Sequence, residues 1–369
     1  MHAYITSIGT HNPPNKFSQE QISEFMIRSL DLKPEDARRL KSLYRATGIK
    51  NRHSVLPDYG SLPENFSFYP RNESLNPLPT TANRMIKYQH CALLEANGAI
   101  EDCINKHPNF NKRDITHLIT VSCTGMTAPG LDIQIVKKFG LSGSVKRTCI
   151  NYMGCYAAFN ALKVGNSIIT SDPTSKVLIV SVELCSLHFQ HRNNDNDIVS
   201  GAIFGDGAAA VLMESNPIDH SSLSIENELC DLIHDDGKNM SWKIGDFGFE
   251  MKLTSEVPSL INGQIQKLAL KILRQKELQL SDVDYFAIHP GGRKILEYVE
   301  ATLQIEQIKN LASWDVLREF GNMSSPTILF VLKKVMDELQ SQNADSNILS
   351  FAFGPGLTLE SILFKSAKA

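Results

Sequence analysis

The chain has 369 residues, 42% of them hydrophobic and 21% charged, which is enough apolar material for the core of one large two-lobed fold. The 37 Lys and Arg residues nearly balance the 40 Asp and Glu residues, so the net charge of −3 gives no reason to expect a nucleic-acid partner. No apolar run approaches the ~20 residues of a membrane span, and the N-terminus lacks a secretory pattern. We therefore expect a cytoplasmic protein without a membrane span.

Seven cysteines, an odd number without a CxxC pair, argue against a disulfide framework and against a four-ligand zinc site. Most of these thiols are expected to pack as small hydrophobic side chains. His191 and the segment from Asp195 to Asp197 match no metal-binding spacing and are expected to lie in a solvated loop. We therefore predict no metal site.

Hydrophobic periodicity predicts helices that alternate with short apolar strands. The predicted helices cover residues 19–31, 83–106, 132–139, 156–170, 259–275, 292–303 and 325–340. The predicted strands cover residues 118–121, 177–182, 208–212, 285–288, 348–353 and 359–363. This alternation is typical of an α/β fold whose sheets are buried and partly parallel.

Several features occur twice in the same order, which indicates an internal duplication. The matching pairs are residues 114–121 with 282–289, Gly154-Cys155 with Gly321-Asn322, the strand at 177 with that at 348, and Phe204-Gly-Asp-Gly207 with Phe353-Gly-Pro-Gly356. We predict two similar half-domains, 1–222 and 223–369. If a pseudo-twofold axis relates them, Cys155 and Asn322 face each other across a shared site.

Three residues at loop ends could carry chemistry. Cys155 precedes a predicted helix, whose N-terminal N–H groups and dipole would stabilise a thiolate; the alternative is an ordinary core cysteine. His289 ends a strand before Pro290-Gly-Gly292 and could pair with that thiolate; the alternative is a ring bonded to the turn backbone. The amide of Asn322 is a donor suited to an oxyanion, and the alternative is a helix N-cap.

Other patterns concern substrate binding. No GxxxxGK[ST] or GxGxxG motif leads into a helix, so we predict no phosphate loop. The Gly-Pro-Gly turn at 354–356 indicates close approach of the backbone to a ligand. Residues 38–53 contain six Lys or Arg and no acid, a pattern of a solvated helix face or of a site for a phosphate-bearing substrate such as coenzyme A.

The motifs resemble those of the type III polyketide synthases, the chalcone synthase-like family with the thiolase fold. The matching segments are Gly9-Thr-His-Asn-Pro-Pro14, Gly154-Cys155, Phe204-Gly-Asp-Gly-Ala-Ala-Ala210, Ile288-His-Pro-Gly-Gly292, Phe320-Gly-Asn-Met-Ser-Ser325 and Phe353-Gly-Pro-Gly-Leu-Thr-Leu-Glu360. The resemblance implies two duplicated half-domains in five αβαβα layers. Ala352 stands where the family motif has its first glycine.

The resemblance also implies roles for particular residues. It makes Cys155, His289 and Asn322 a catalytic triad, Phe204 a gatekeeper, and Met251 the substitute for a second gatekeeper phenylalanine. It places further cavity and substrate contacts at Cys123, Thr124, Glu183, Cys185, His188, Trp242, Ser324, Phe353 and Gly354. Contacts to coenzyme A are expected at Arg39, Arg45 and Lys294. Two further family positions are Ser42 and Ala46 here, and Arg45 or, as the alternative, Lys41 would substitute for them. For Glu183, a paired structural carboxylate remains the alternative.

By this resemblance the protein is an acyltransferase. Cys155 accepts a starter from an acyl-CoA, His289 keeps Cys155 ionised, and decarboxylation of malonyl-CoA drives a Claisen condensation. No cofactor beyond coenzyme A thioesters is expected, and the protein is expected to be a homodimer. The alternative is a ketoacyl synthase III-like enzyme that performs one condensation and accepts substrates from an acyl-carrier protein. A protein that only binds acyl-CoA is disfavoured, because binding does not require a nucleophile.

Overall fold

A computed structural model describes residues 2–108, 110–233, 237–254, 256–341 and 345–367. Its strands are β1 (Tyr4–His11), β2 (Asn15–Ser18), β3 (Asn51–Ser54), β4 (His117–Ser122), β5 (Lys146–Asn151), β6 (Val177–Leu184), β7 (Asp206–Glu214), β8 (Leu223–Leu232), β9 (Met240–Gly245), β10 (Gly248–Leu253), β11 (Tyr285–Ile288), β12 (Asn347–Gly354) and β13 (Thr358–Ser366). Its α-helices are α1 (Gln19–Ser29), α2 (Pro34–Ala46), α3 (Thr81–Asn105), α4 (Leu131–Phe139), α5 (Ala157–Ser171), α6 (Asp195–Ile203), α7 (Val257–Arg274), α8 (Arg293–Leu303), α9 (Leu311–Phe320) and α10 (Thr327–Leu339).

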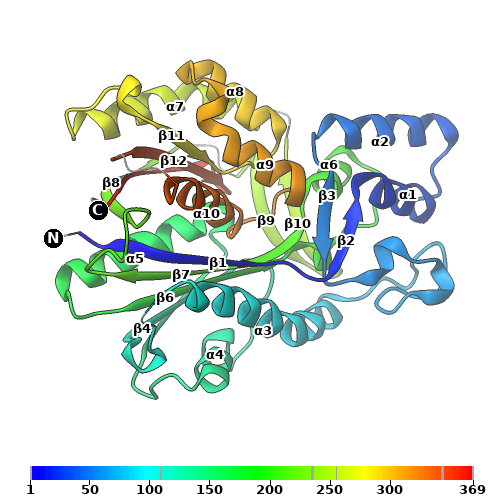
Figure 1. Cartoon of the computed structure of the whole chain (residues 1–369). Helices are drawn as coiled ribbons and strands as arrows, with labels where there is room; N and C mark the ends of the chain where they lie inside the picture. Colours follow the sequence, from blue (N-terminus) through cyan, green and yellow to red (C-terminus); the bar gives the residue numbers. More distant parts are fainter. Residues whose placement is uncertain (1, 109, 234–236, 255, 342–344, 368–369) are drawn as a thin grey trace.

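Five layers make up the body of the molecule (Figure 1). Helices α3 and α4 cover one outer face, α7 and α8 cover the other, and α5 and α10 lie between the two halves of the sheet. The sheet is mixed, with the order β11-β12-β13-β8-β1-β7-β6-β4-β5. The expected αβαβα arrangement is therefore confirmed.

The strand order repeats within the sheet. In β1-β7-β6-β4 two antiparallel pairings are followed by a parallel one, and β8-β13-β12-β11 shows the same sequence of pairings. The two sets are joined by a short antiparallel pairing of β1 with β8, in which Tyr4 lies opposite Ser224. The boundary between residues 222 and 223 stays a prediction.

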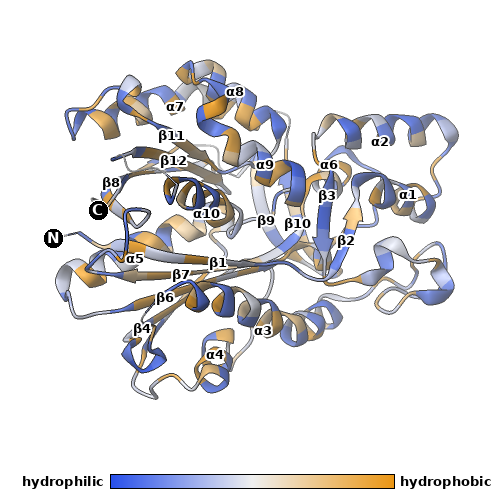
Figure 2. Cartoon of the chain, viewed as in Figure 1, coloured by the Kyte–Doolittle hydropathy of each residue, from blue (hydrophilic) through white to orange (hydrophobic). Residues whose placement is uncertain are grey.

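The N-terminal halves of the inner helices are largely buried. The buried residues of α5 and α10 join those of the facing strands in one hydrophobic cluster between the two halves of the sheet. Figure 2 shows apolar residues along the sheet and both colours on the outer helices. A helix that packs on both faces needs an apolar surface all round, which explains the weak polarity of these two segments. They therefore present their N-terminal ends to the interior.

All the predicted helices and strands form, with ends within a few residues of those expected. Strand β1 was not predicted, because Gly9 interrupts its pattern; a Cβ there would lie 2.1 Å from the backbone nitrogen of Cys103 on α3. The solvated loop expected at 195–197 is wrong. Asn194 caps helix α6 there by accepting from the N–H of Asp197, and the Asp197 carboxylate is buried.

Candidate active site

One cavity of about 720 Å³ brings together the three residues proposed for catalysis. Cys155 comes from the turn before α5, His289 from the end of β11, and Asn322 from the loop between α9 and α10. The lining also includes ten of the residues expected to contact substrate: Cys123, Thr124, Cys185, His188, Phe204, Trp242, Met251, Lys294, Ser324 and Phe353. Glu183, Gly354, Arg39 and Arg45 are not part of the lining.

Cys155 lies in a single 3-10 turn, Gly154–Tyr156, that leads into α5. Gly154 has a positive φ of 79°, and a Cβ on it would lie 2.2 Å from the Pro355 ring. A Cβ on Gly354 would meet the Tyr156 ring at 2.5 Å. The Gly-Pro-Gly turn therefore packs closely against the backbone that carries Cys155. This contact, and not the ligand contact expected from the sequence, requires a glycine at position 354.

His289 follows β11, and its backbone N–H donates to the carbonyl of Phe351 at 2.8 Å. The side chain is 1% exposed, and neither ring nitrogen has a hydrogen-bond partner among the described residues. The alternative of a ring bonded to the turn backbone is therefore wrong. Because unpartnered buried polar atoms are rare, this ring is a strong candidate to bind a reacting group.

Asn322 is held by both its backbone and its side chain. Its Nδ2 donates to the carbonyl of Gly291 at 3.3 Å, and its Oδ1 accepts from the N–H of Ser324 at 2.7 Å. The Cys155 thiol lies 4.0 Å from the same Oδ1. Helix α10 begins at Thr327, so the N-cap alternative is wrong. One Nδ2 hydrogen remains for a ligand oxygen.

Burial sets the protonation of the thiol and the imidazole. It raises the pKa of Cys155 to about 11, although hydrogen bonding from Ser324 and Asn322 acts in the opposite direction. It lowers the pKa of His289 to about 3. Desolvation disfavours the charged form of each group, so burial acts against our expectation that His289 keeps Cys155 ionised.

Glu183 lies behind the cavity wall and is fully buried. One carboxylate oxygen accepts from the N–H of Cys123 at 2.9 Å and from the hydroxyl of Thr124 at 2.8 Å, and the other accepts from the hydroxyl of Ser325 at 2.5 Å. Burial raises its pKa to about 7. These contacts favour the alternative of a structural carboxylate that fixes the residues at 123 and 124.

The raised pKa of Glu183 predicts a dependence of stability on pH. The folded protein holds this proton more tightly than the unfolded chain, so its contribution is complete below about pH 4.5 and is lost as the pH rises to about 7. Relative to Glu183→Gln, the wild type should lose about 3 kcal/mol of unfolding free energy over that range. Urea denaturation of both proteins at pH 4.5 and 7.5 measures this, and equal pH profiles would contradict it.

The hairpin of β9 and β10 forms part of the cavity wall. Trp242 and Met251 are paired across it, and the Trp242 indole donates to the carbonyl of Cys123 at 2.8 Å. The His188 ring stacks on Phe249 with centroids 4.2 Å apart. This hairpin was not predicted from the sequence, although apolar and polar residues alternate on both sides of Asp246-Phe247, a pattern that signals a two-residue turn.

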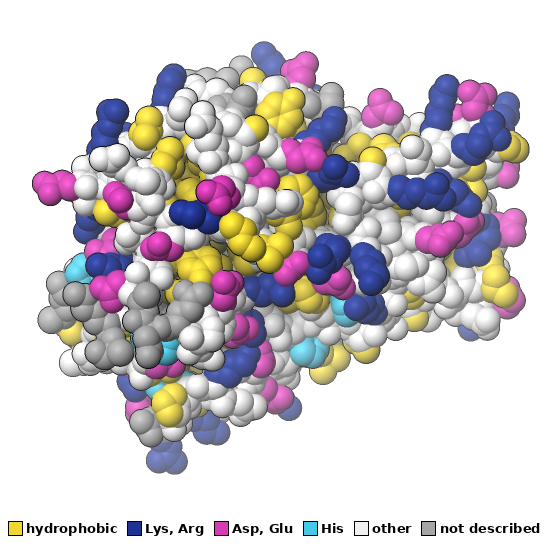
Figure 3. Space-filling model, turned by 45° about the horizontal axis from the view of Figure 1, so that its top comes forward, with side chains coloured by type: hydrophobic (Ala, Val, Ile, Leu, Met, Phe, Trp, Pro, Cys, Tyr) yellow, Lys and Arg dark blue, Asp and Glu magenta, His cyan; other side chains and the backbone are white. Residues whose placement is uncertain are grey.

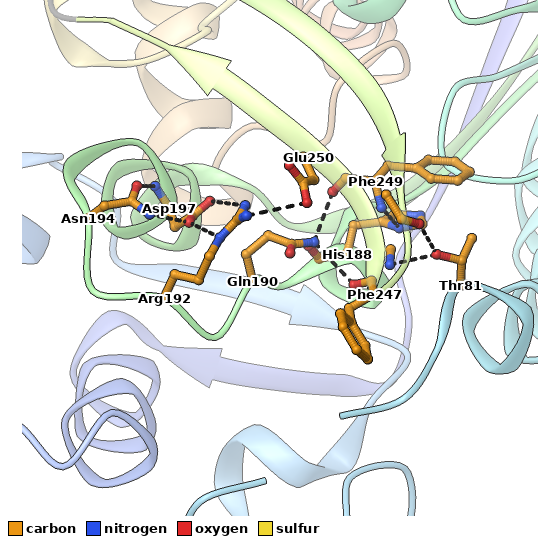
Figure 4. Close-up of polar contacts among 11 residues, drawn as sticks. Thr81, His188, Gln190, Arg192, Asn194, Asp197, Phe247, Phe249 and Glu250 are labelled. Carbon is orange, nitrogen blue, oxygen red and sulfur yellow. Dashed lines mark hydrogen bonds and ion pairs between the residues drawn. The ribbon is translucent and has the colours of Figure 1, made fainter. Parts of the chain in front are cut away.

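Polar contacts fix this hairpin to α6 (Figure 4). The Gln190 amide donates to the carbonyls of His188, Phe247 and Phe249 at 3.0–3.2 Å. Arg192 pairs with Asp197 on α6 at 2.7 Å and with Glu250 on β10 at 3.3 Å. The His188 Nδ1 accepts from the N–H of Phe249, so its other nitrogen donates to the carbonyl of Thr124. His188 is therefore a neutral structural histidine, and burial lowers its pKa to about 3.

Three basic residues line the cavity: Arg52 on β3, and Arg293 and Lys294 at the start of α8. Leu43, Ala46 and Thr47, near the end of α2, line it too. Figure 3 shows Lys and Arg, interspersed with acidic residues, over the part of the molecule that α1 and α2 form. Arg45 is exposed on α2 beside the lining residues. Arg39 is also exposed and pairs with Glu35 at 3.2 Å.

The sequence predicts neither a membrane span nor a metal site. In the described part of the chain, no helix is both long and apolar enough to span a bilayer. Within the same residues, no group of three or more His, Cys, Asp or Glu side chains could hold a metal ion.

Solved structures with the same fold place the chain in a class of enzymes. The C-terminal type III polyketide synthase domain of Steely1, a type I/III hybrid from Dictyostelium, superposes with a TM-score of 0.89 at 28% identity, covering 99% of both chains. PKS-I from the brown alga Ectocarpus siliculosus superposes with a TM-score of 0.90 at 29% identity, covering 99% of this chain and 98% of that one. The fold is thus that of the thiolase-fold type III polyketide synthases.

Sequence comparison gives the family. The model for the N-terminal domain of chalcone and stilbene synthases matches residues 1–217, and that for the C-terminal domain matches residues 225–368. The alpha-pyrone synthesis polyketide synthase-like Pks18 of Mycobacterium tuberculosis is 30% identical over 98% of this chain and 91% of its own length. Type III polyketide synthase A of Arabidopsis thaliana is 30% identical over 99% of this chain and 93% of its own length.

The chain belongs to the chalcone and stilbene synthase family. It is an acyltransferase of the type III polyketide synthase class, which extends a starter acyl group by decarboxylative Claisen condensation. The expected enzyme class is confirmed, and none of these relatives favours the ketoacyl synthase III-like alternative.

Proposed function

We propose that the enzyme loads an acyl-CoA starter on Cys155 and extends it with malonyl-CoA, using His289 and Asn322 as the other two catalytic residues. The observation that carries this assignment is the unpartnered, buried imidazole of His289 in the cavity that Cys155 and Asn322 also line. Incubation with a panel of acyl-CoAs and malonyl-CoA, followed by mass analysis of the products, tests it. Acyl exchange without release of CO₂ or a chain-extended product would contradict it.

In the loading step, neutral His289 accepts the proton of Cys155 while the sulfur attacks the thioester carbonyl. The coenzyme A thiolate leaves and takes the proton back from the imidazolium. This general-base route suits the neutral pair that burial favours. It replaces the standing thiolate that we expected from the sequence.

In the extension step, malonyl-CoA loses CO₂ and the electron pair moves to its thioester oxygen. The N–H of neutral His289 and the remaining Nδ2 hydrogen of Asn322 donate to this enolate oxygen. The enolate carbon then attacks the acyl-Cys155 carbonyl, and the Cys155 sulfur departs as a thiolate and takes a proton from solvent. The step balances with coenzyme A thioesters and one solvent proton, so it calls for no cofactor.

The outermost strand supports a homodimer in solution. Strand β5 forms one edge of the sheet and is exposed along most of its length. Exposed Met126 and Leu94 add apolar surface, with 47% and 64% of their area accessible. An open edge strand tends to pair with another chain, and a twofold pairing closes it. Light scattering during gel filtration should give twice the monomer mass.

Charge reversal at the basic end of the cavity should weaken substrate binding. Arg45→Glu with Lys294→Glu should raise KM for acyl-CoA several-fold, to about 10-fold, with little change in kcat, because the phosphates lie far from the reacting carbon. Added salt should act in the same direction. Arg39→Glu serves for comparison and should have less effect, since Arg39 pairs with Glu35 outside the lining. An unchanged KM in the double variant would place the phosphates elsewhere.

The same assay separates the two carriers. Faster loading from an acyl-carrier-protein thioester than from the matching acyl-CoA would favour the ketoacyl synthase III-like alternative. We expect the coenzyme A thioester to be preferred, because the chain belongs to the chalcone and stilbene synthase family, whose type III enzymes use coenzyme A thioesters.

A further inference from the structure

Arg52 differs from the other basic residues of the segment 38–53. It is 4% exposed on β3, whereas the other five are exposed or half-buried. It forms no ion pair among the described residues, although a buried charge without a partner is costly. Its guanidinium lies 5.8 Å from the centre of the Tyr44 ring, within the range of a cation–π contact. Arg52 also lines the cavity and its Nη2 has no hydrogen-bond partner among the described residues, so a contact to substrate is the alternative to the role argued below.

The polar contacts of Arg52 lead to the end of α6. Its Nη1 donates to the carbonyl of Phe204 at 2.6 Å, and its Nε donates to Oε1 of Gln19 at 3.0 Å. The amide of Gln19 in turn donates to the carbonyl of Ala202 at 2.6 Å. A cation here faces the negative end of the helix dipole, which offsets part of the cost of its burial.

Asn322 is bonded to the same end of α6. Its backbone N–H donates to the carbonyl of Ile203 at 2.9 Å, and its carbonyl accepts from the N–H of Gly205 at 2.9 Å. Three successive carbonyls, at residues 202, 203 and 204, thus accept from Gln19, Asn322 and Arg52. The end of α6 is therefore the element through which Arg52 and the catalytic amide are connected.

The alkyl stem of Arg52 also packs against the chain just before Asn322. Gly321 has a positive φ of 67°, and a Cβ on it would lie 3.0 Å from Cγ and Cδ of Arg52. A Cβ on Gly205 would lie 3.5 Å from Cβ of Arg52. The stem therefore packs against both of the segments that pair with each other through Phe204 and Asn322.

We propose that Arg52 is a positioning residue that holds the amide of Asn322 where it donates to the enolate formed from malonyl-CoA. This inference rests on the proposed role of Asn322. Cys155 and His289 are carried by other elements, so displacement of Asn322 affects decarboxylation more than loading. A displacement of about 1 Å at a catalytic donor is enough to cost a factor of about 100.

The test compares two steps in the same variants. Arg52→Met keeps the length of the stem and removes the donors; it should lower the release of CO₂ from malonyl-CoA about 10- to 100-fold while loading of Cys155 stays within about twofold. Arg52→Lys keeps the charge but cannot bond both acceptors, so its rate of CO₂ release should lie between those of the wild type and Arg52→Met. Gln19→Leu removes the link to Ala202 with Arg52 still present. It should also lower decarboxylation more than loading, but by a smaller factor.

A matched control separates positioning from loss of stability. Arg84 is also buried, and it donates to the carbonyls of Pro79, Leu187 and Phe189, away from Asn322. Arg84→Met should lower the melting temperature as Arg52→Met does, yet leave the ratio of decarboxylation to loading unchanged. If Arg52→Met does not fold, Arg52→Lys and Gln19→Leu are compared with Arg84→Lys.

The decisive experiment combines Arg52→Met with Asn322→Ala. If Arg52 acts through Asn322, Arg52→Met should cause no further loss of decarboxylation in Asn322→Ala. A further loss of the same size, or an equal loss of loading and decarboxylation in the single variant, would overturn the proposal. If Asn322→Ala decarboxylates malonyl-CoA normally, the proposed role of Asn322 is refuted. If Asn322→Ala is inactive but Arg52→Met decarboxylates normally, only the proposed role of Arg52 is refuted.

Discussion

Replacing Cys155 with alanine should abolish condensation and remove the acyl adduct from the intact protein. The alanine variant keeps the turn at 154–156 and the cavity, because alanine fits the space that the cysteine occupies. It lacks only the nucleophile, without which no thioester intermediate forms. Incubation with acyl-CoA followed by intact mass and peptide mapping measures the adduct.

The other thiols make this test specific. Cys185 lines the same cavity, and Cys149 and Cys230 are exposed, so each could take an acyl group if the assignment to Cys155 were wrong. Cys230→Ala removes an exposed thiol outside the lining and should load and condense normally. Product formation by Cys155→Ala, or an adduct that maps to Cys149 or Cys185, would contradict the assignment.

The second large effect is expected from Asn322→Ala. This variant should load the starter at a near-normal rate at neutral pH, because loading requires the thiol and a base. It should release CO₂ from malonyl-CoA about 10²- to 10³-fold more slowly, the cost of about 3–4 kcal/mol that follows loss of one oxyanion donor. Single-turnover loading, measured by protection from iodoacetamide, is followed beside release of radiolabelled CO₂.

His289→Ala should be defective in both steps, and only loading should recover at high pH. In the wild type, loading should be nearly flat from about pH 5 to 9, because the pKa of His289 is about 3 and that of Cys155 about 11. Without the base, the rate should rise about tenfold for each pH unit, because only the thiolate reacts. No pH rescue of loading, or normal decarboxylation by Asn322→Ala, would contradict this division of labour.

The sequence alone determined the elements whose signals are local. Helices such as α5 and α10 repeat apolar residues at helical spacing, and strands such as β6 and β12 are short, mostly apolar runs, so local patterns located them. The repeated order of motifs indicated the duplication, and the resemblance indicated the enzyme class. The hairpin of β9 and β10 and helix α6 were missed because short, partly polar segments resemble loops in the sequence; in the structure the two pack against each other.

The state of the site was decided by the tertiary structure. From its position before a helix, Cys155 looked set to be a thiolate, but burial depends on neighbours far along the chain and reverses that expectation. Burial also distinguishes Arg52, which in the sequence is one more charge in a basic segment. Charge is a property of the residue, whereas desolvation and hydrogen-bond partners are properties of the folded surroundings, so no local pattern could show which basic residue faces solvent and which fixes the end of α6.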